Sequence, residues 1–288
     1  MGRDRLYPFT EQGNKMSEYH AYIRNIILLL VVLLIGCKGG NFKNIAQDGS
    51  KIDNEGESVY LGSEKCLIDI YENDDLLNGK AVFVALHENE TTCIAAFYEL
   101  NGKNSFKLVR VRQSGKRLLK GSHNGKSYYF DPNRIFSISG IESTLKTHNK
   151  NHTEKMIVGV KECSGAILKA IKQESRYAYI IALHNNTDGA PFSINTYQNS
   201  SDAVDVFISD KMDPDNFFLT TKREDFNFFR EHRQNVVLQS KNVTDDGSLS
   251  VFCQKKNIPY INIEAQSGMV DEQKEMIQLC VSLMETKK

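Results

Sequence analysis

The sequence has no excess of positive or negative charge. It also contains no CxxC pair and no apolar run long enough to span a bilayer comfortably. It has 36 basic and 36 acidic residues, so composition gives no argument for nucleic-acid binding. Its 40% hydrophobic content is ordinary for a soluble globular protein, which excludes a polytopic membrane protein. No internal repeat is evident, and 288 residues suffice for one large domain with a substantial core.

The few cysteines limit what sulfur can do in this chain. If Cys37 carries a lipid, as argued below, five cysteines remain, which is an odd number without paired spacing. This argues against a dense disulfide framework and against a thiolate zinc site, although a single disulfide stays open for an exported protein. Cys93 and Cys280 fall in helical patterns and are predicted to be buried as small apolar residues.

The N-terminal region reads as an export signal. Residues 26–35 are uninterruptedly apolar, follow Arg24 and end at Gly36-Cys37. Spanning needs about 20 apolar residues, whereas a secretory signal has a short apolar core with a basic flank. The Leu-Ile-Gly-Cys order resembles a bacterial lipobox, which implies lipidation at Cys37 and anchoring in the bacterial cell envelope. The alternative is a plain anchor helix with an incidental cysteine.

Three regions are therefore expected along the chain. Residues 1–37 form the signal peptide with its lipobox, and Met16 is an alternative start because the preceding residues are polar. Residues 38–58, rich in Gly, Asn, Asp, Ser and Lys, form a flexible tether. Residues 59–288 form the globular domain.

Within that domain, apolar runs and helical patterns alternate. Strands are predicted at 81–86, 106–112, 156–160, 177–183, 203–209 and 258–263, and helices at 91–100, 164–174, 222–233 and 271–285. This alternation predicts an α/β fold with a mixed, mostly parallel central sheet and helices on both faces. The stretch 114–153 is long, polar and poor in pattern, as functional irregular segments often are.

Two predicted strands are each followed by a histidine. His87-Glu88-Asn89-Glu90 follows the first, and His184 follows the run 177–183. The carboxyl edge of an open α/β sheet is where ligands bind, and zinc accepts imidazole and carboxylate together. We expect the ligand atoms of His87, Glu90 and His184 to lie within about 4 Å of one another. Taken singly, each histidine is more often a satisfied core or surface residue.

Two further features carry chemistry. Asp131-Pro132-Asn133-Arg134 lies between the candidate ligands, and its Asn133 and Arg134 can grip a carboxylate by a charge-assisted fork. The alternative is a simple Asp-Pro-Asn turn. Glu264 ends the last predicted strand and can act as a general base that activates water. The alternative is an exposed strand-end carboxylate.

Taken together and in this order, these four motifs resemble those of the zinc carboxypeptidase superfamily, and within it those of the aspartoacylase and succinylglutamate desuccinylase branch. Its motifs resemble His87-Glu88-Asn89-Glu90-Thr91, Asp131-Pro132-Asn133-Arg134-Ile135-Phe136, Leu183-His184-Asn185-Asn186-Thr187 and the late Glu264. The separations between motifs are also similar, and the resemblance covers residues 80–273.

The resemblance implies that residues 59–288 form a zinc hydrolase-like domain with a zinc carboxypeptidase-like sheet, and it implies a role for each motif residue. His87, Glu90 and His184 would ligate Zn²⁺, Glu264 would be the general base, and Asn133 with Arg134 would bind a substrate carboxylate; an arginine, Arg134 among the candidates, would also polarise the scissile carbonyl. Family members often carry a second arginine shortly before the Asn-Arg pair, and Lys126 stands nearest that place. Tyr197 is a candidate for the substrate-clamping tyrosine. The branch's C-terminal β-domain is expected to be absent, which would leave a more open site.

The expected function is a lipid-anchored zinc hydrolase that cleaves an amide bond next to a carboxylate, of the carboxypeptidase or acyl-amino-acid deacylase type. Its partners would be a small peptide or acyl-amino-acid substrate and a membrane reached through the N-terminal lipid, with no nucleic acid. The alternative is a binding lipoprotein that keeps the fold without turnover.

Overall fold

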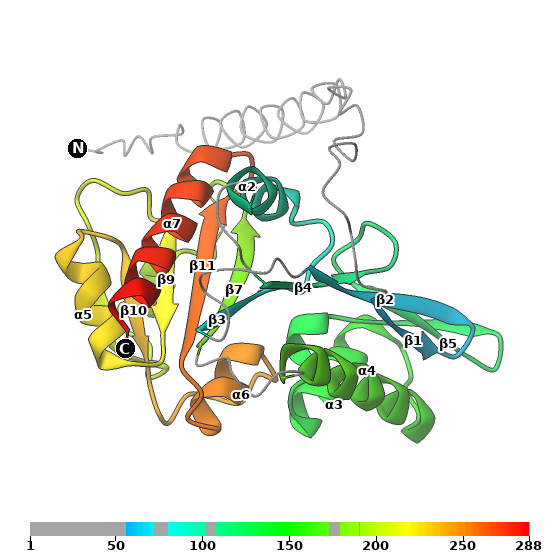
Figure 1. Ribbon diagram of the computed structural model, residues 1–288. Helices are drawn as coiled ribbons and strands as arrows, with labels where there is room; N and C mark the ends of the chain where they lie inside the picture. The colour runs from blue at the N-terminus through cyan, green and yellow to red at the C-terminus, as the bar shows by residue number, and fades with distance from the viewer. Residues whose placement is uncertain (1–55, 72–79, 102–106, 173–178, 190, 288) are drawn as a thin grey trace, which may run out of the picture. The chain divides into compact units, whose positions relative to one another are not determined.

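The computed structural model describes residues 56–71, 80–101, 107–172, 179–189 and 191–287 (Figure 1). Chain contacts separate Met1–Lys51 from a second unit, Ile52–Lys288, and only the second contains described residues. The signal-like run, Cys37 and Met16 lie outside the described residues, as does the predicted tether up to residue 55. Within the part that is described, no helix has both the length and the apolarity to cross a bilayer.

A large mixed sheet forms the centre of the domain. In the described residues it has nine strands in the order β1-β2-β4-β3-β7-β11-β9-β10-β8. Strands β4, β3, β7 and β11 pair in parallel at the centre, while β1, β2 and β8 join by antiparallel pairing. In sheet order the strands are β1 (Glu57–Leu61), β2 (Glu64–Tyr71), β4 (Lys107–Arg112), β3 (Ala81–Ala85), β7 (Tyr179–Asn186), β11 (Tyr260–Gln266), β9 (Phe217–Thr220), β10 (Val236–Gln239) and β8 (Ala203–Phe207).

Helices cover both faces of this sheet, because its central strands carry apolar side chains on both sides. Val82 and Val84 of β3 face one core with α3 (Ile138–His148), α4 (Glu154–Lys172) and α6 (Leu249–Lys255). Phe83 faces the other core with α2 (Thr91–Asn101), α5 (Arg223–Glu231) and α7 (Val270–Thr286). The two helical layers are visible on opposite sides of the sheet in Figure 1. The predicted α/β class is confirmed.

The strand predicted at 156–160 is wrong, because these residues belong to α4. Buried side chains recur along that helix at spacings of three and four, from Met156 and Val160 to Cys163 and Ile167. This is the period of one helical face. A short apolar run read in isolation concealed that longer period.

The stretch 114–153 is also more regular than predicted. It contains the hairpin β5 (Leu119–His123) and β6 (Lys126–Phe130), the 3₁₀ turn η1 (Pro132–Arg134) and helix α3. Asn124 and Gly125 connect the hairpin strands with φ of 51° and 71°. An Asn-Gly pair between strands is the strongest short-range hairpin signal, so the sequence did contain evidence for this element. Strands β1, β2, β9 and β10 and helix α6 were likewise not predicted.

The cysteines among the described residues are buried with free thiols. Cys93 lies on α2 and Cys280 on α7, and neither is exposed. Both therefore behave as the small apolar core residues that the helical pattern predicted.

Candidate metal centre

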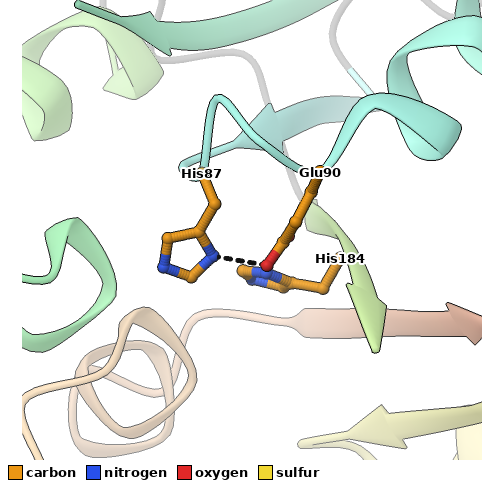
Figure 2. A group of neighbouring side chains, drawn as sticks. All are labelled: His87, Glu90 and His184. Atoms are coloured by element: carbon orange, nitrogen blue, oxygen red, sulfur yellow. Dashed lines mark hydrogen bonds and ion pairs between the residues drawn. The ribbon is translucent and has the colours of Figure 1, made fainter. Parts of the chain in front are cut away.

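Three side chains converge where β3 ends and α2 begins (Figure 2). His87 follows β3, and Glu90 immediately precedes α2 after a turn in which the Glu90 N–H donates to the His87 carbonyl. His184 comes from the adjacent parallel strand β7, which continues to Asn186, so the histidine lies within the strand. One ligand atom from each residue lies within 4.8 Å of the others. This is slightly wider than the expected 4 Å, but the structure brings the three together.

The Nδ1 atoms of both histidines lie close to the Glu90 carboxylate. His87 Nδ1 lies 2.8 Å from Oε1, and His184 Nδ1 lies 2.9 Å from Oε2. His87 Nδ1 is out of line for a hydrogen bond to Glu90 and, among the described residues, it is buried without any hydrogen-bond partner. A buried ring nitrogen beside a carboxylate and a second imidazole is a donor set that suits zinc.

The other ring nitrogens are held from outside this trio. His87 Nε2 lies 2.8 Å from Asp131 Oδ1, and His184 Nε2 lies 3.4 Å from Asn133 Nδ2. A partner on the far nitrogen is what orients an imidazole toward a metal and sets its tautomer. Asp131 belongs to the predicted motif, but the sequence did not assign it this role.

Electrostatics keep Glu90 ionised. Burial by itself raises the pKa of Glu90, but the neighbouring His184 and His87 outweigh it and hold that pKa well below its usual range. Burial lowers the pKa of His87, yet the neighbouring carboxylates of Asp131 and Glu90 raise it by more, so the net shift is upward. The carboxylates around His87 therefore favour the protonated form of its ring.

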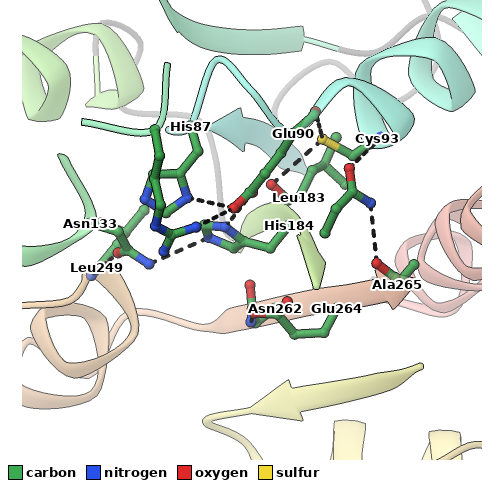
Figure 3. Close-up of polar contacts among 12 residues, drawn as sticks. His87, Glu90, Cys93, Asn133, Leu183, His184, Leu249, Asn262, Glu264 and Ala265 are labelled. Carbon is green, nitrogen blue, oxygen red and sulfur yellow. Dashed lines mark hydrogen bonds and ion pairs between the residues drawn. The ribbon is translucent and has the colours of Figure 1, made fainter. Parts of the chain in front are cut away.

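Glu264 stands on the strand next to His184. The two residues are paired in register between β11 and β7, so their side chains lie on the same face of the sheet (Figure 3). The Glu264 carboxyl is buried, and Asn262 Nδ2 donates to its Oε1 at 2.9 Å. Burial raises the pKa of Glu264, and the nearby His184 only partly opposes this. A carboxyl group with a raised pKa beside two histidines is suited to exchange protons.

Asn133 and Arg134 lie on η1, which approaches the same centre. The Asn133 side-chain oxygen accepts the N–H of Leu249 at 3.0 Å, which fixes the amide group beside His184. The Arg134 guanidinium donates to the Asn133 carbonyl at 2.7 Å and lies 3.7 Å from Asp246. Its side chain is 39% exposed, so donor groups remain accessible to an incoming carboxylate.

Lys126 is not brought to this centre. It opens β6, is exposed and pairs with His123 beside the hairpin turn. Lys126 lies four positions before Phe130, which corresponds to roughly 13 Å along the strand. The site's second guanidinium comes from Arg117, which the sequence analysis missed. Arg117 lies 2.8 Å from Glu90 and 3.3 Å from Asp131; nothing in its local sequence distinguishes it from other basic residues.

Tyr197 closes η2 (Ile194–Tyr197) near the site. Burial raises its pKa, and the charges of Glu264 and Asp246 act in the same direction, which places the phenol within electrostatic reach of both. Tyr197 also lines a hollow of about 650 Å³ together with residues of β8. None of the residues that line this hollow belongs to the metal centre.

Comparisons with known proteins give only distant similarities. No family model matches the sequence, and no curated protein matches it. A candidate metallopeptidase structure from Shewanella baltica is 10% identical over 80% of this chain and 85% of its own, with a TM-score of 0.39. A succinylglutamate desuccinylase structure from Vibrio parahaemolyticus is 10% identical over 80% and 66%, with a TM-score of 0.42. Thrombin activatable fibrinolysis inhibitor is 12% identical over 81% and 68%, with a TM-score of 0.35. Scores this low leave the function to be argued from this chain's own residues.

Proposed function

We propose that this protein is a zinc-dependent hydrolase that cleaves an amide bond next to a carboxylate, of the carboxypeptidase or acyl-amino-acid deacylase type. The observation that carries the proposal is the buried His87, Glu90 and His184 donor set with a buried carboxylate, Glu264, on the neighbouring strand. A purely structural cluster has no need for a fourth ionisable residue, here a carboxyl group with a raised pKa, on the same face of the sheet.

Each residue of the site has a role in this proposal. Zinc, when bound by the trio, would supply Lewis-acid chemistry that polarises a carbonyl and acidifies water. Glu264 takes a proton from the attacking water and returns it to the leaving amine. Asn133 and Arg134 hold the substrate carboxylate through directed donors. The half-exposed Arg117 guanidinium, which lies beside Glu90, would stabilise negative charge that develops on the scissile carbonyl oxygen.

Lipid anchoring through Cys37 and a place in the bacterial cell envelope are part of the proposal. They are supported by the basic, apolar and Leu-Ile-Gly-Cys order of residues 24–37. A small peptide or an acyl-amino acid is the proposed substrate class, because both carry a free carboxylate beside a hydrolysable amide.

The test combines metal binding with turnover. The purified protein is stripped with a chelator and titrated with Zn²⁺, and hydrolysis is then measured on acyl-amino acids and short peptides, each also supplied with its carboxylate amidated. Zinc-dependent cleavage of the free-carboxylate forms supports the proposal. Tight zinc binding without cleavage of any panel member would favour the alternative, a binding lipoprotein that keeps the fold without turnover.

A further inference from the structure

The loop that delivers Arg117 to the site is fastened by Glu88. This residue lies between two candidate ligands, His87 and Glu90, yet its side chain is used elsewhere. Its Oε2 atom accepts the backbone N–H of Gln113 and that of Gly115, each at 2.6 Å. Hydrogen bonds from N–H groups to a carboxylate are short and about twice as strong as neutral ones, so this contact fixes the loop backbone.

The same loop is closed at its base by Gln113. Its side-chain oxygen accepts the N–H of Lys120 at 2.6 Å, and its side-chain nitrogen donates to the Lys120 carbonyl at 2.8 Å. Gly115 has φ of 71°, a conformation that a residue with a side chain adopts only with strain. The loop of residues 113–120 therefore has a fixed base, a required glycine and an anchor for its backbone N–H groups, the Glu88 carboxylate, in addition to the side-chain ion pairs of Arg117 and Lys120.

We propose that Glu88 is a positioning residue that holds the loop 113–120 so that Arg117 reaches the metal centre; the catalytic part of this inference rests on the proposed function. Arg117 follows the clamped Gly115 by two residues and contacts both Glu90 and Asp131. A free arginine side chain has many rotamers. Fixing the backbone two residues earlier removes much of the freedom that would otherwise take the guanidinium away.

Glu88 also links two parts of the site that are distant in sequence. It belongs to the turn that carries His87 and Glu90, so it ties the backbone of the Arg117 loop to the turn of the metal ligands, in addition to the direct contact of Arg117 with Glu90. The clamp therefore predicts that loss of Glu88 displaces Arg117 while leaving the ligand trio in place. If Glu88 stabilised only its own turn, its loss would leave the position of Arg117 unchanged.

Limited proteolysis with trypsin tests the clamp without requiring activity. Lys116 and Arg117 lie in the loop, and exposed Lys150, between α3 and α4, serves as an internal reference site. In the zinc-loaded full chain, Glu88→Ala should speed cleavage after Lys116 and Arg117 at least tenfold relative to Lys150, because a released loop opens more often. Glu88→Gln keeps one acceptor oxygen, so its rate of loop cleavage should lie between those of the parent and Glu88→Ala. Cleavage of Glu88→Ala at the parental rate would overturn the clamp.

A matched control is Glu99→Ala, which removes a carboxylate of the same kind from an ion pair with Lys274 on the surface. It should be cleaved like the parent protein. Thermal unfolding of all variants checks that the fold is kept, and Glu88→Gln serves if Glu88→Ala does not fold.

Kinetics test the positioning role. Glu88→Ala should lower kcat roughly 10–100-fold, as loss of a supporting contact typically does, with KM and zinc affinity little changed. Adding Glu88→Ala to Arg117→Ala should cost nothing more, because both act through one guanidinium. Rapid loop cleavage with unchanged kcat, or fully additive losses, would refute positioning. If the parent hydrolyses nothing, the proposed function and the positioning role fail together, while the proteolysis result still decides the clamp.

Discussion

Replacing Glu264 by glutamine should separate chemistry from metal binding. Glutamine has nearly the same size as glutamate, and its side-chain oxygen can still accept the Asn262 donor that now lies 2.9 Å from Glu264. Glu264 is outside the ligand trio, so zinc should be retained. What the substitution removes is the ability to take up and return a proton.

The size of the effect follows from that loss. Removing a positioned general base typically costs 10²–10⁴-fold in rate, which corresponds to about 2.7–5.4 kcal/mol at 1.36 kcal/mol per factor of ten. Stability should change much less, because the buried side chain keeps its volume and its one hydrogen bond.

The pH profile supplies an independent signature. A general base works in its ionised form, and burial raises the pKa of Glu264. In the parent, kcat/KM should therefore rise with pH through a value above the ordinary range for glutamate. In Glu264→Gln, whatever activity remains should lack this acid limb.

The assay measures bound zinc by mass spectrometry and hydrolysis by release of the amine product from pH 4 to 9. The comparison variant is His87→Ala, which removes a ligand instead of the base. If Glu264→Gln holds one equivalent of zinc and turns over substrate at the parental rate, Glu264 is not the base and the mechanism proposed above is wrong.

Three further predictions follow from the site and the N-terminal sequence. His87→Ala should lose both zinc and turnover, because it removes the buried Nδ1 that faces Glu90; metal titration by calorimetry checks this, and zinc affinity equal to the parent's would contradict it. Arg134→Ala should raise KM roughly 10–100-fold for substrates with a free carboxylate, since removing a charge-assisted fork costs about 1.5–3 kcal/mol, and should leave their amidated counterparts unaffected; equal effects on both forms would speak against a carboxylate contact. Cys37→Ser should accumulate an unprocessed precursor of higher mass on gels and by mass spectrometry, whereas normal processing would exclude Cys37 as the lipid site.

The fold class was readable from the sequence because its signals are local. The apolar runs that became β3, β7 and β11 each show their burial within a few consecutive residues, and α2 and α7 show the helical period. Helix α4 was partly misread because a five-residue window cannot separate a buried helical turn from a strand. The hairpin at Asn124-Gly125 had a readable signal that was overlooked.

The sequence by itself determined that a histidine follows each of two buried apolar runs, 81–86 and 177–183. The parallel pairing of β3 with β7 then brings His87 and His184 to one edge of the sheet. Only the tertiary structure decided which other side chains join them. Lys126 stands nearest the position of the family's second arginine along the chain. It lies at the hairpin end of β6, however, and a strand advances about 3.3 Å per residue, so Lys126 does not reach the metal centre. Arg117 has no distinctive spacing and arrives through a loop closed by Glu88, a contact across 25 residues. Such long-range loop contacts depend on how the whole chain packs, and no local pattern encodes them.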